Sequence, residues 1–377
     1  MRNAVSAGLA TRLAFLAAGI GLASWAPLVP FAKSRLGIGD AELGLLLLCL
    51  GVGSVLAMLA TGPLGVRFGS RRIINASGLA VAIFLPLLAI APSPALLGLG
   101  LFAFGAAIGS LDVAMNMHAV QVERAAGRNL MSGFHALFSI GAFAGAGVVT
   151  LLLSAGWSPL AAAGVSAAFV AVAGLVARPG LLSTRGVAGD PLFALPRGIV
   201  LILALLAATT FLVEGAILDW SALLLTEGGL LPLVQGGAGF MAFSVTMTLG
   251  RLTGDAMTSR FGDLWVLIGG GVMSVAGFAI LLTAPHAVPV LAGYALVGLG
   301  AANIVPILFR RAGAQTRMPP GLAIAAITTL AYGGMLLGPA AVGAVAEAAD
   351  LRTAFWMLAG LMALVPLLAP VVARRTR

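Results

Sequence analysis

Charged residues are scarce in this chain of 377 residues, because Asp, Glu, Lys and Arg together make up only 9% of it. A soluble domain usually carries about 25% charged residues, so the composition excludes an ordinary soluble fold. Hydrophobic residues reach 60%, and the mean hydropathy is +1.11. Apolar runs of about 18 residues or more, long enough for a membrane-spanning helix, recur along the whole length. The sequence therefore predicts an all-α membrane protein without room for a sizeable soluble domain.

Cysteine and lysine are nearly absent. Cys49 is the single cysteine, which excludes a disulfide framework and a cysteine-based metal site. Lys33 is the single lysine and no GxxxxGK(S/T) pattern surrounds it, so the chain has no phosphate loop for ATP hydrolysis. Ser/His/Asp sets, HExxH and paired metal ligands at catalytic spacing are missing as well. We therefore expect no enzymatic activity, no catalytic residue, no metal and no cofactor.

The net charge of +9 does not indicate a nucleic-acid partner, because of where the basic residues stand. They cluster in every second loop, which is the positive-inside pattern of membrane proteins. With an even number of spans, all of them except Lys33, Arg35 and Arg352 lie in or near loops of a single compartment. We expect that compartment to be the cytoplasm, with both termini in it and the chain in the bacterial inner membrane.

Twelve apolar segments predict twelve spanning helices. Their approximate ranges are 9–31, 43–62, 73–91, 95–120, 130–154, 160–177, 198–221, 238–257, 264–284, 287–309, 321–346 and 353–373. A polar stretch at 178–197, with arginines, prolines and small residues, predicts a cytoplasmic linker between two halves. The expected domains are a six-helix bundle over 1–177, this linker, and a second six-helix bundle over 198–377.

The two halves resemble each other. Displacing the sequence by 193 residues without gaps places Arg67-Phe68-Gly69 on Arg260-Phe261-Gly262. The same displacement superimposes glycines in pairs, namely Gly44 and Gly237, Gly78 and Gly271, Gly100 and Gly293, Gly105 and Gly298, Gly141 and Gly334, and Gly145 and Gly338. Six helices followed by six more in a parallel repeat is a transporter plan, with the substrate site between the halves near the bilayer midplane.

Polar side chains interrupt the apolar segments at 95–120 and 130–154. Asp112 and Asn116 are four residues apart and share one helix face, and His135 is expected at a comparable depth on the next helix. A carboxylate near the middle of a membrane helix costs about 2.5–3.5 kcal/mol, so Asp112 should face a water-filled cavity or a polar partner. We interpret the three residues as half of a polar site. A structural hydrogen bond to a neighbouring helix is the alternative for Asp112, and His135 either relays protons or pairs with Asp112 or Asn116.

The second half carries its own polar side chains. Glu214 has no basic residue near it in sequence and, with Asp112, is a candidate proton carrier, because few embedded cations are available for a buried carboxylate. Asp219 lies near the outer end of its helix and is either a gating acid or a solvated helix-end acid. Trp25 and Trp220 occupy comparable depths in the two halves and are either interfacial anchors or stacking surfaces for a sugar-like solute. In the first half, His118 is nearer the cytoplasmic end and is expected to be solvated.

The turn GPLGVRFGSRR at 62–72 resembles a loop of a known family. Five of its residues match the loop between helices two and three of the major facilitator superfamily: Gly62, Leu64, Arg67, Gly69 and Arg71. Val66 stands where the family has an aspartate. The resemblance covers essentially the full chain. LDVAMN at 111–116, SGFHALFS around His135 and LDWS at 218–221 are similar to a branch of bacterial permeases related to fucose permease and rhizopine-type transporters.

The resemblance implies the major facilitator fold, alternating access, and a cavity lined by helices one, four, seven and ten. That cavity would include Asp112, Asn116, Glu214, Asp219 and Asn303. The resemblance also implies a cytoplasmic latch, which we expect from Asp255 and Arg260 in the second half. Arg67, Gly69 and Arg71 form the corresponding turn of the first half, where positive-inside orientation alone also explains the arginines.

These features predict a secondary active transporter for a small polar organic solute such as a sugar or polyol, coupled to protons through Asp112, Glu214 or both. The expected partners are the solute, protons and the lipid bilayer, without nucleic acid, and the chain is expected to be a monomer. A drug or metabolite efflux antiporter is one alternative, disfavoured because Ala146 stands where the drug-antiporter signature has a proline. A non-transporting membrane receptor or scaffold is the other.

Overall fold

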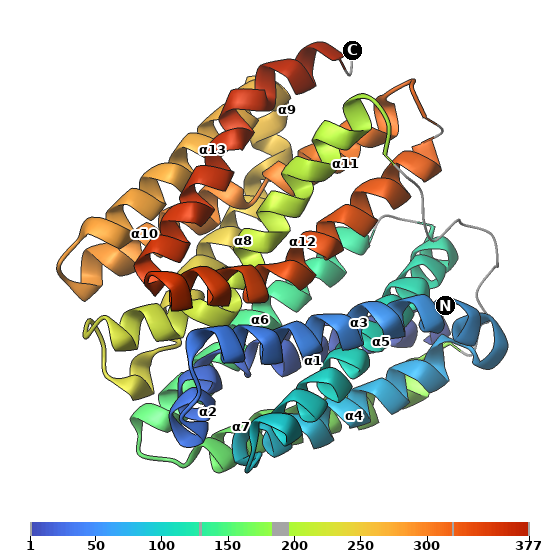
Figure 1. Ribbon diagram of the computed structural model, residues 1–377. Coiled ribbons are helices and arrows are strands. Elements are labelled where there is room, and N and C mark those ends of the chain that lie inside the picture. The colour runs from blue at the N-terminus through green and yellow to red at the C-terminus, as the bar shows by residue number, and fades with distance from the viewer. Residues whose placement is uncertain (1, 128–129, 183–195, 319, 376–377) are drawn as a thin grey trace. The chain divides into compact units, whose positions relative to one another are not determined.

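The computed structural model describes residues 2–127, 130–182, 196–318 and 320–375, and these fold into helices without a β-strand among them (Figure 1). Within these residues, 12 helical segments are long and apolar enough to cross a membrane. This confirms the prediction of an all-α membrane protein with twelve spanning helices. Residues 183–195, which make up most of the predicted linker, lie outside the described part of the chain.

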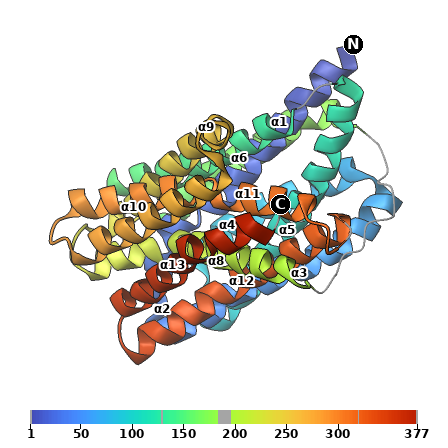
Figure 2. The ribbon, with the colours of Figure 1, turned by 90° about the horizontal axis from the view of Figure 1, so that it is seen from above.

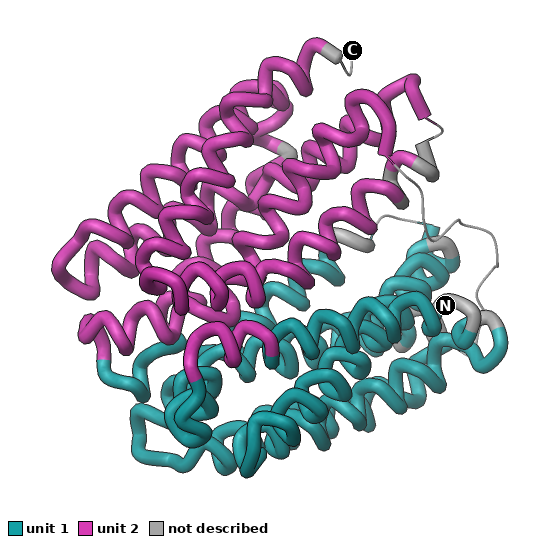
Figure 3. The backbone as a smooth tube through the Cα atoms, in the orientation of Figure 1, with its two compact units in different colours: residues 1–38, 46–189, 232–237 teal, residues 39–45, 190–231, 238–377 magenta. Residues whose placement is uncertain are grey.

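Two compact units divide the chain (Figure 3). The N-terminal unit comprises residues 1–38, 46–189 and 232–237, and the C-terminal unit comprises residues 39–45, 190–231 and 238–377. The division follows the two halves of the sequence except in the short segments 39–45 and 232–237, each of which belongs to the unit of the other half.

The N-terminal unit is a bundle of helices in which consecutive spans run in opposite directions. Its elements are α1 (Arg2–Ala23), α2 (Val29–Leu36), most of α3 (Asp40–Phe68), α4 (Ser70–Ile90), α5 (Pro94–Ala126), α6 (Met131–Ser154) and α7 (Pro159–Ala177). Inside this unit α1 packs along α6, and α4 packs against both α5 and α7 (Figures 1 and 2). The first span runs from Ala7 to Leu36 and contains a 3₁₀ turn, Ala26–Leu28, where Pro27 separates α1 from α2.

The C-terminal unit contains α8 (Ile199–Glu227), α9 (Ala238–Thr283), α10 (Ala287–Ala301), α11 (Ile304–Ala314), α12 (Pro320–Ala348) and α13 (Leu351–Arg375). Here α10 packs along α9, and α12 packs along α8. The long α9 contributes to two spans, Leu233–Gly254 and Ala256–Thr283, and its helix bends at Gly262. α10 and α11 form one span that is broken at Ala302 and Asn303. Pro306 accounts for the break, because it has no N–H to donate to the carbonyl of Ala302.

The repeated Arg-Phe-Gly sequence folds in the same way in both units. Gly69 and Gly262 both take a positive φ, of 82° and 76°, which side-chain-bearing residues rarely adopt. In front of each glycine an arginine lies over the following phenylalanine, with Arg67 Cζ 5.1 Å from the ring centroid of Phe68 and Arg260 Cζ 5.5 Å from that of Phe261. The internal repeat inferred from the sequence is therefore also a repeat of backbone geometry.

A pair of repeated glycines brings helices together by equivalent contacts. Gly105 of α5 lies directly on the backbone of Leu50 in α3, and Gly298 of α10 lies directly on the backbone of Phe243 in α9. The same displacement of 193 residues relates both members of the two contacts. Small residues at such crossings let helix backbones approach closely, which is a main source of packing energy in a membrane.

Arg35 of α2 caps the C-terminal end of α4, at the end of the unit opposite its arginine-rich turns. Its guanidinium donates hydrogen bonds to the carbonyl oxygens of Leu88, Ala89 and Ala91 at 3.1, 2.5 and 3.2 Å. These carbonyls have no partner within the helix, and a cation at a helix C-terminus also interacts favourably with the helix dipole. This contact gives a structural reason why a basic residue stands at an end where the positive-inside pattern expects none.

Carboxylate side chains accept hydrogen bonds from backbone amides at the N-termini of two helices, α13 and α3. Asp350 Oδ1 accepts a hydrogen bond of 2.6 Å from the backbone N–H of Thr353 at the start of α13, and this bond holds the pKa of the Asp350 carboxyl below its usual 3.8. Glu347 Oε2, on α12, accepts a hydrogen bond of 3.3 Å from the backbone N–H of Ala41 in the first turn of α3. Each acid lies at the N-terminus of the helix whose amide it binds, where negative charge is stabilising.

We predict that Gly105→Ala destabilises the protein by about 1–3 kcal/mol, because the added Cβ must displace the backbone of Leu50. Gly164→Ala in α7 is the matched control, since a Cβ there meets no heavy atom within 4 Å. Thermal unfolding of the purified variants in detergent measures the difference. Equal unfolding temperatures for the two variants would contradict the close approach of α5 to α3.

Candidate functional site

The polar residues of α5 contact each other. The side-chain amide of Asn116 donates to the backbone oxygen of Asp112 at 2.9 Å and to its carboxylate Oδ1 at 3.3 Å. Both side chains are half-buried. The predicted sharing of one helix face is therefore realised. An amide stabilises the carboxyl group of Asp112 without adding a positive charge, so this contact is compatible with either protonation state.

His135 lies on α6 at its contact with α1. Its imidazole is exposed and meets the buried ring of Phe15 edge-on, with 5.2 Å between the ring centroids. Phe15 also stacks on Phe134, the residue before His135, at 5.8 Å. The aromatic contacts fix the position of the imidazole beside α1, and its role as a proton relay or a pairing partner remains a prediction.

Glu214 of α8 forms an ion pair with Arg251 of α9. The guanidinium Nη2 lies 3.1 Å from Oε1 of the carboxylate and 3.5 Å from Oε2. The expectation that Glu214 is isolated from cations is therefore wrong. Arg251 comes 13 residues after Ala238, where α9 begins, and Glu214 comes 13 residues before Glu227, where α8 ends. Because the two helices run antiparallel, these equal distances place both groups at the same depth.

Asn303 stands at the break between α10 and α11 and is buried. Its side-chain amide donates a hydrogen bond of 3.0 Å to the backbone oxygen of Gly250, the residue before Arg251. The contact ties the interrupted span to α9 beside the ion pair. Irregular backbone at membrane depth is tolerated where protein buries it or where it lines a cavity. The structure thus gathers Glu214, Arg251 and Asn303 from three parts of the C-terminal unit.

Asp219, Trp25 and Trp220 are interior residues. Asp219 is 8% exposed, so the alternative of a solvated helix-end acid is wrong. Trp25 and Trp220 are 1% and 0% exposed, so neither indole is an interfacial anchor or presents a face on which a solute could stack. Trp220 belongs to α8, and Trp25 follows α1. Each of these helices packs against several other helices of its own unit, and this packing buries the indoles.

The latch expected from Asp255 and Arg260 stays a prediction, because the side chain of Asp255 lies outside the described part of the structure and Arg260 is exposed over Phe261. A further acid lies nearby in this unit. Asp263, directly after the bend at Gly262, pairs with both Arg310 and Arg311 near the end of α11, with 2.5 Å between Arg311 Nε and Asp263 Oδ2. In the sequence, this cluster is indicated by the acid that directly follows the glycine of the Arg-Phe-Gly repeat, Asp263 after Gly262.

Arg67, Gly69 and Arg71 are placed as a turn at the end of the N-terminal unit. Arg67 is exposed and Arg71 half-buried, and both line a surface groove between the ends of α3, α4 and α7. Gly69 provides the positive φ that separates α3 from α4. The turn therefore has the shape expected from its sequence, without the acid that Val66 replaces.

His118 is fully buried, which corrects the expectation that it is solvated. Its Nε2 accepts a hydrogen bond of 2.8 Å from the backbone N–H of Leu182, where the chain leaves α7. Because Nε2 is the acceptor, Nδ1 carries the ring proton and donates to Thr11 Oγ1 at 3.0 Å. Thr11 in turn donates to the backbone oxygen of Ala7 at 2.8 Å. One imidazole thus connects α5, α1 and the start of the linker.

Comparison with known proteins shows a likeness over the full length. A model of the Major Facilitator Superfamily matches residues 13–309. An uncharacterised MFS-type transporter of Yersinia pestis is 47% identical over 372 residues, which is 98% of this chain and 97% of the relative. An uncharacterised transporter of Sinorhizobium fredii is 34% identical over 379 residues, covering 99% and 100%. The crystal structure of a nucleoside transporter, NupG, superimposes with a TM-score of 0.78 at 16% identity, covering 98% of this chain and 99% of that one.

We predict that Glu214→Gln and Arg251→Gln each destabilise the protein, and that the double variant loses less stability than the sum of the two. Each single change leaves one charge without its partner. The side chains of Arg251 and Glu214 are 40% and 23% exposed, so a coupling free energy of about 0.2–1 kcal/mol is expected.

Thermal unfolding in detergent measures this cycle. Arg260→Gln, which removes an exposed arginine from the same helix, serves as the control and should change stability by less than about 0.5 kcal/mol. Strictly additive losses for Glu214 and Arg251 would show that the ion pair does not stabilise the unit.

Proposed function

The chain belongs to the major facilitator superfamily, and we propose that it is a secondary active transporter that moves a small polar organic solute by alternating access. The observation that carries this proposal is the set of ionisable groups kept inside the spans of both units. Ionisable residues in membrane helices are costly and mark substrate or proton pathways. A protein that served only as a scaffold would have no use for an ion pair and a carboxyl group at such depth.

The chemistry of the polar residues favours a solute rich in hydroxyl or amide groups. Asp112 and Asn116 offer acceptors and an amide donor, and Glu214 and Arg251 offer a carboxylate and a guanidinium. Binding sites of this kind reject solutes that leave the polar groups unpaired, since each unsatisfied group costs free energy. Sugars and polyols fit this description. Nucleosides fit it as well, and NupG, whose fold is similar, is a nucleoside transporter.

We propose that Asp112 carries the coupled proton. The Glu214–Arg251 ion pair would then respond to the change of charge at Asp112. Asp112 accepts a hydrogen bond from the side-chain amide of Asn116 on the same helix face. Glu214 already has a cation, so its protonation would release Arg251. A carboxyl group that exchanges protons on alternate sides can couple transport to the proton gradient.

We place the protein in the bacterial inner membrane as a monomer with both termini in the cytoplasm. The arginine-rich ends of the two units support this orientation, because basic residues accumulate on the cytoplasmic side. Arg35, which stands at the opposite end, is bound to the carbonyls that end α4. On this orientation the Asp263–Arg310–Arg311 cluster lies on the cytoplasmic side, where it would serve as the latch of the C-terminal unit.

Efflux of apolar drugs is the alternative within transport. Ala146 follows Gly145 on α6, where the drug-antiporter signature has a proline, and Gly145 lies directly on the backbone of Ile20 in α1. The α1–α6 crossing is thus closely packed without a proline. The polar groups listed above have no evident use for an apolar cargo.

We predict that Asp112→Asn abolishes proton-driven accumulation of the solute while leaving exchange intact. Asparagine keeps the hydrogen bonds of the site and cannot carry a proton. Solutes would first be identified by their effect on thermal unfolding of the purified protein, using panels of sugars, polyols, nucleosides and drugs. Uptake and internal pH would then be followed in proteoliposomes.

The matched control for this experiment is Glu42→Gln, which removes an exposed carboxylate from the first turn of α3 and should transport like the natural protein. Accumulation by Asp112→Asn with unchanged pH dependence would rule out coupling through this residue. Absence of any solute flux across the panels, in protein that is folded, would favour the receptor or scaffold alternative.

We also predict that reporter fusions after residue 182 and at the C-terminus are active only as cytoplasmic reporters, because the arginine-rich ends should stay on that side. Paired alkaline phosphatase and fluorescent protein fusions measure this. Fusions in the segment 155–158 provide the periplasmic control. Phosphatase activity at the C-terminus would reverse the proposed orientation.

A further inference from the structure

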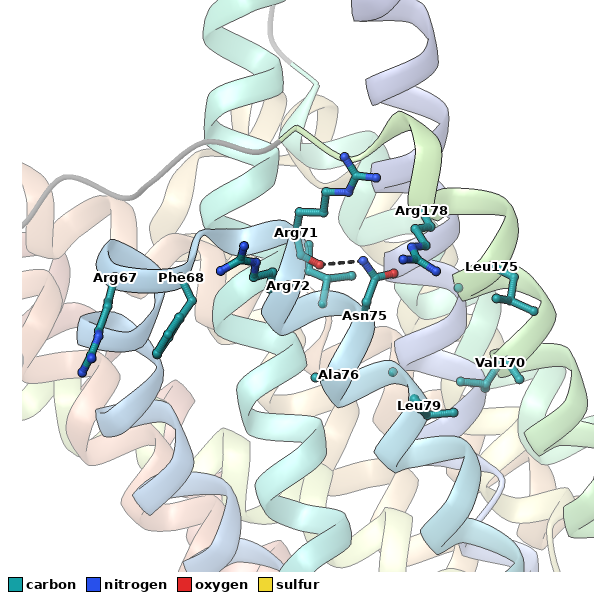
Figure 4. A pocket seen from close by; sticks show the side chains of 14 residues that line it. Arg67, Phe68, Arg71, Arg72, Asn75, Ala76, Leu79, Val170, Leu175 and Arg178 are labelled. Atoms are coloured by element: carbon teal, nitrogen blue, oxygen red, sulfur yellow. Dashed lines mark hydrogen bonds between the residues drawn. The ribbon is translucent and has the colours of Figure 1, made fainter.

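A groove with a volume of about 810 Å³ opens at the arginine-rich end of the N-terminal unit (Figure 4). The ends of α3, α4 and α7 form its walls. Four arginines line it: Arg67, Arg71, Arg72 and Arg178. No carboxylate is among its described lining residues. The groove therefore concentrates positive charge from three helices around one hollow.

The start of α4 adds to this positive charge. Its first turn contains Arg71 and Arg72 and no acid, and the N-cap position is Gly69, which has no side chain to accept a hydrogen bond. Basic residues at a helix N-terminus are unfavourable with respect to the helix dipole. An anion bound at this position would offset both the dipole and the arginines.

In the C-terminal unit, the repulsion between arginines at the corresponding end is offset by an acidic residue of the protein itself. Displacement by 193 residues relates Ser70, at the start of α4, to Asp263. In the C-terminal unit, Asp263 takes Arg310 and Arg311 as partners. At the corresponding place the N-terminal unit has Ser70 where the other unit has an acid. Positive-inside orientation explains why arginines stand at this end, and the groove brings Arg67, Arg71, Arg72 and Arg178 to one hollow.

Apart from Asn75, the rest of the groove is apolar and continues into the outer surface of the unit. Leu79 of α4 and Val170 and Leu175 of α7 line it, and Leu79 and Leu175 are 57% and 67% exposed. Two stripes of exposed apolar side chains lead away from it along the helices, Leu79, Ile83 and Leu87 on α4 and Val165, Phe169, Val172 and Val176 on α7. Their spacing of three or four residues places each stripe on one helix face.

We propose that this groove binds the phosphodiester head group of an anionic phospholipid, with an acyl chain lying along the seam between α4 and α7. Guanidinium groups bind phosphate oxygens by paired, charge-assisted hydrogen bonds. Basic pockets between spanning helices are suited to anionic head groups. The site requires only that the chain resides in a membrane, and on the orientation proposed above it takes lipid from the cytoplasmic leaflet.

The test uses the full chain purified in a neutral detergent and titrated with short-chain phosphatidylglycerol. Short-chain phosphatidylcholine, glycerol phosphate and inorganic phosphate are titrated in parallel, and thermal unfolding reports binding. The natural protein should be stabilised by phosphatidylglycerol far more than by the other three. Arg72→Gln combined with Arg178→Gln should weaken the apparent affinity by about tenfold or more, as expected when charge-assisted hydrogen bonds are lost.

Arg260→Gln is the matched control, because Arg260 is the repeat counterpart of Arg67 but lies outside the groove. It should retain the full response to phosphatidylglycerol. Leu175→Ser tests the apolar wall and should weaken the lipid response without increasing the response to phosphate. Equal stabilisation by glycerol phosphate or inorganic phosphate would overturn the lipid in favour of a soluble anion. An equal response of the Arg72/Arg178 variant and the natural protein would overturn the site.

Discussion

Backbone hydrogen bonding in hydrocarbon is the constraint on which the rest of this structure depends. Inside a bilayer no water is available for a free carbonyl or amide, so spans must be helical and any interruption must be repaired by the protein. At the interruption, the side chain of Asn303 donates a hydrogen bond to the carbonyl of Gly250, which anchors the broken span to α9. The end of α4 is closed by the guanidinium of Arg35. Polar side chains thus stand where helices stop or break.

The same lack of water governs the charged side chains, and the chain uses two different solutions. Glu214 and Asp263 each meet arginine, so that their charge is compensated in place. Asp112 accepts a hydrogen bond from the side-chain amide of Asn116. The first arrangement ties two helices together through an ion pair, whereas the second lies within one helix.

The elements of the fold could be predicted from the sequence because each depends on local composition. Long apolar runs gave the spans, and Arg67-Phe68-Gly69 with its repeat gave two turns that share a positive φ at Gly69 and Gly262. The contact of Asp112 with Asn116 also followed from spacing on one helix. These inferences need no knowledge of how helices are rotated about their axes.

Pairings between helices were the part that the sequence did not reveal. In a soluble bundle the polar face of a helix reports which side is buried, but here both the lipid side and the protein side are apolar. The partner of Glu214 could be found only by matching the depth of Arg251 on another helix. The burial of Trp25, Trp220 and His118 escaped prediction for the same reason, since side chains near a helix end can be interior or exposed depending on rotation.

The hydrogen bond between Glu347 and the start of α3 has a consequence for how the protein is made. The two residues are 306 positions apart, and the segment 39–45 belongs to the unit formed by the second half of the chain. The hydrogen bond between Glu347 and Ala41 can therefore form only after α12 has been synthesised. The first turn of α3 makes this contact long after the rest of that helix has left the ribosome.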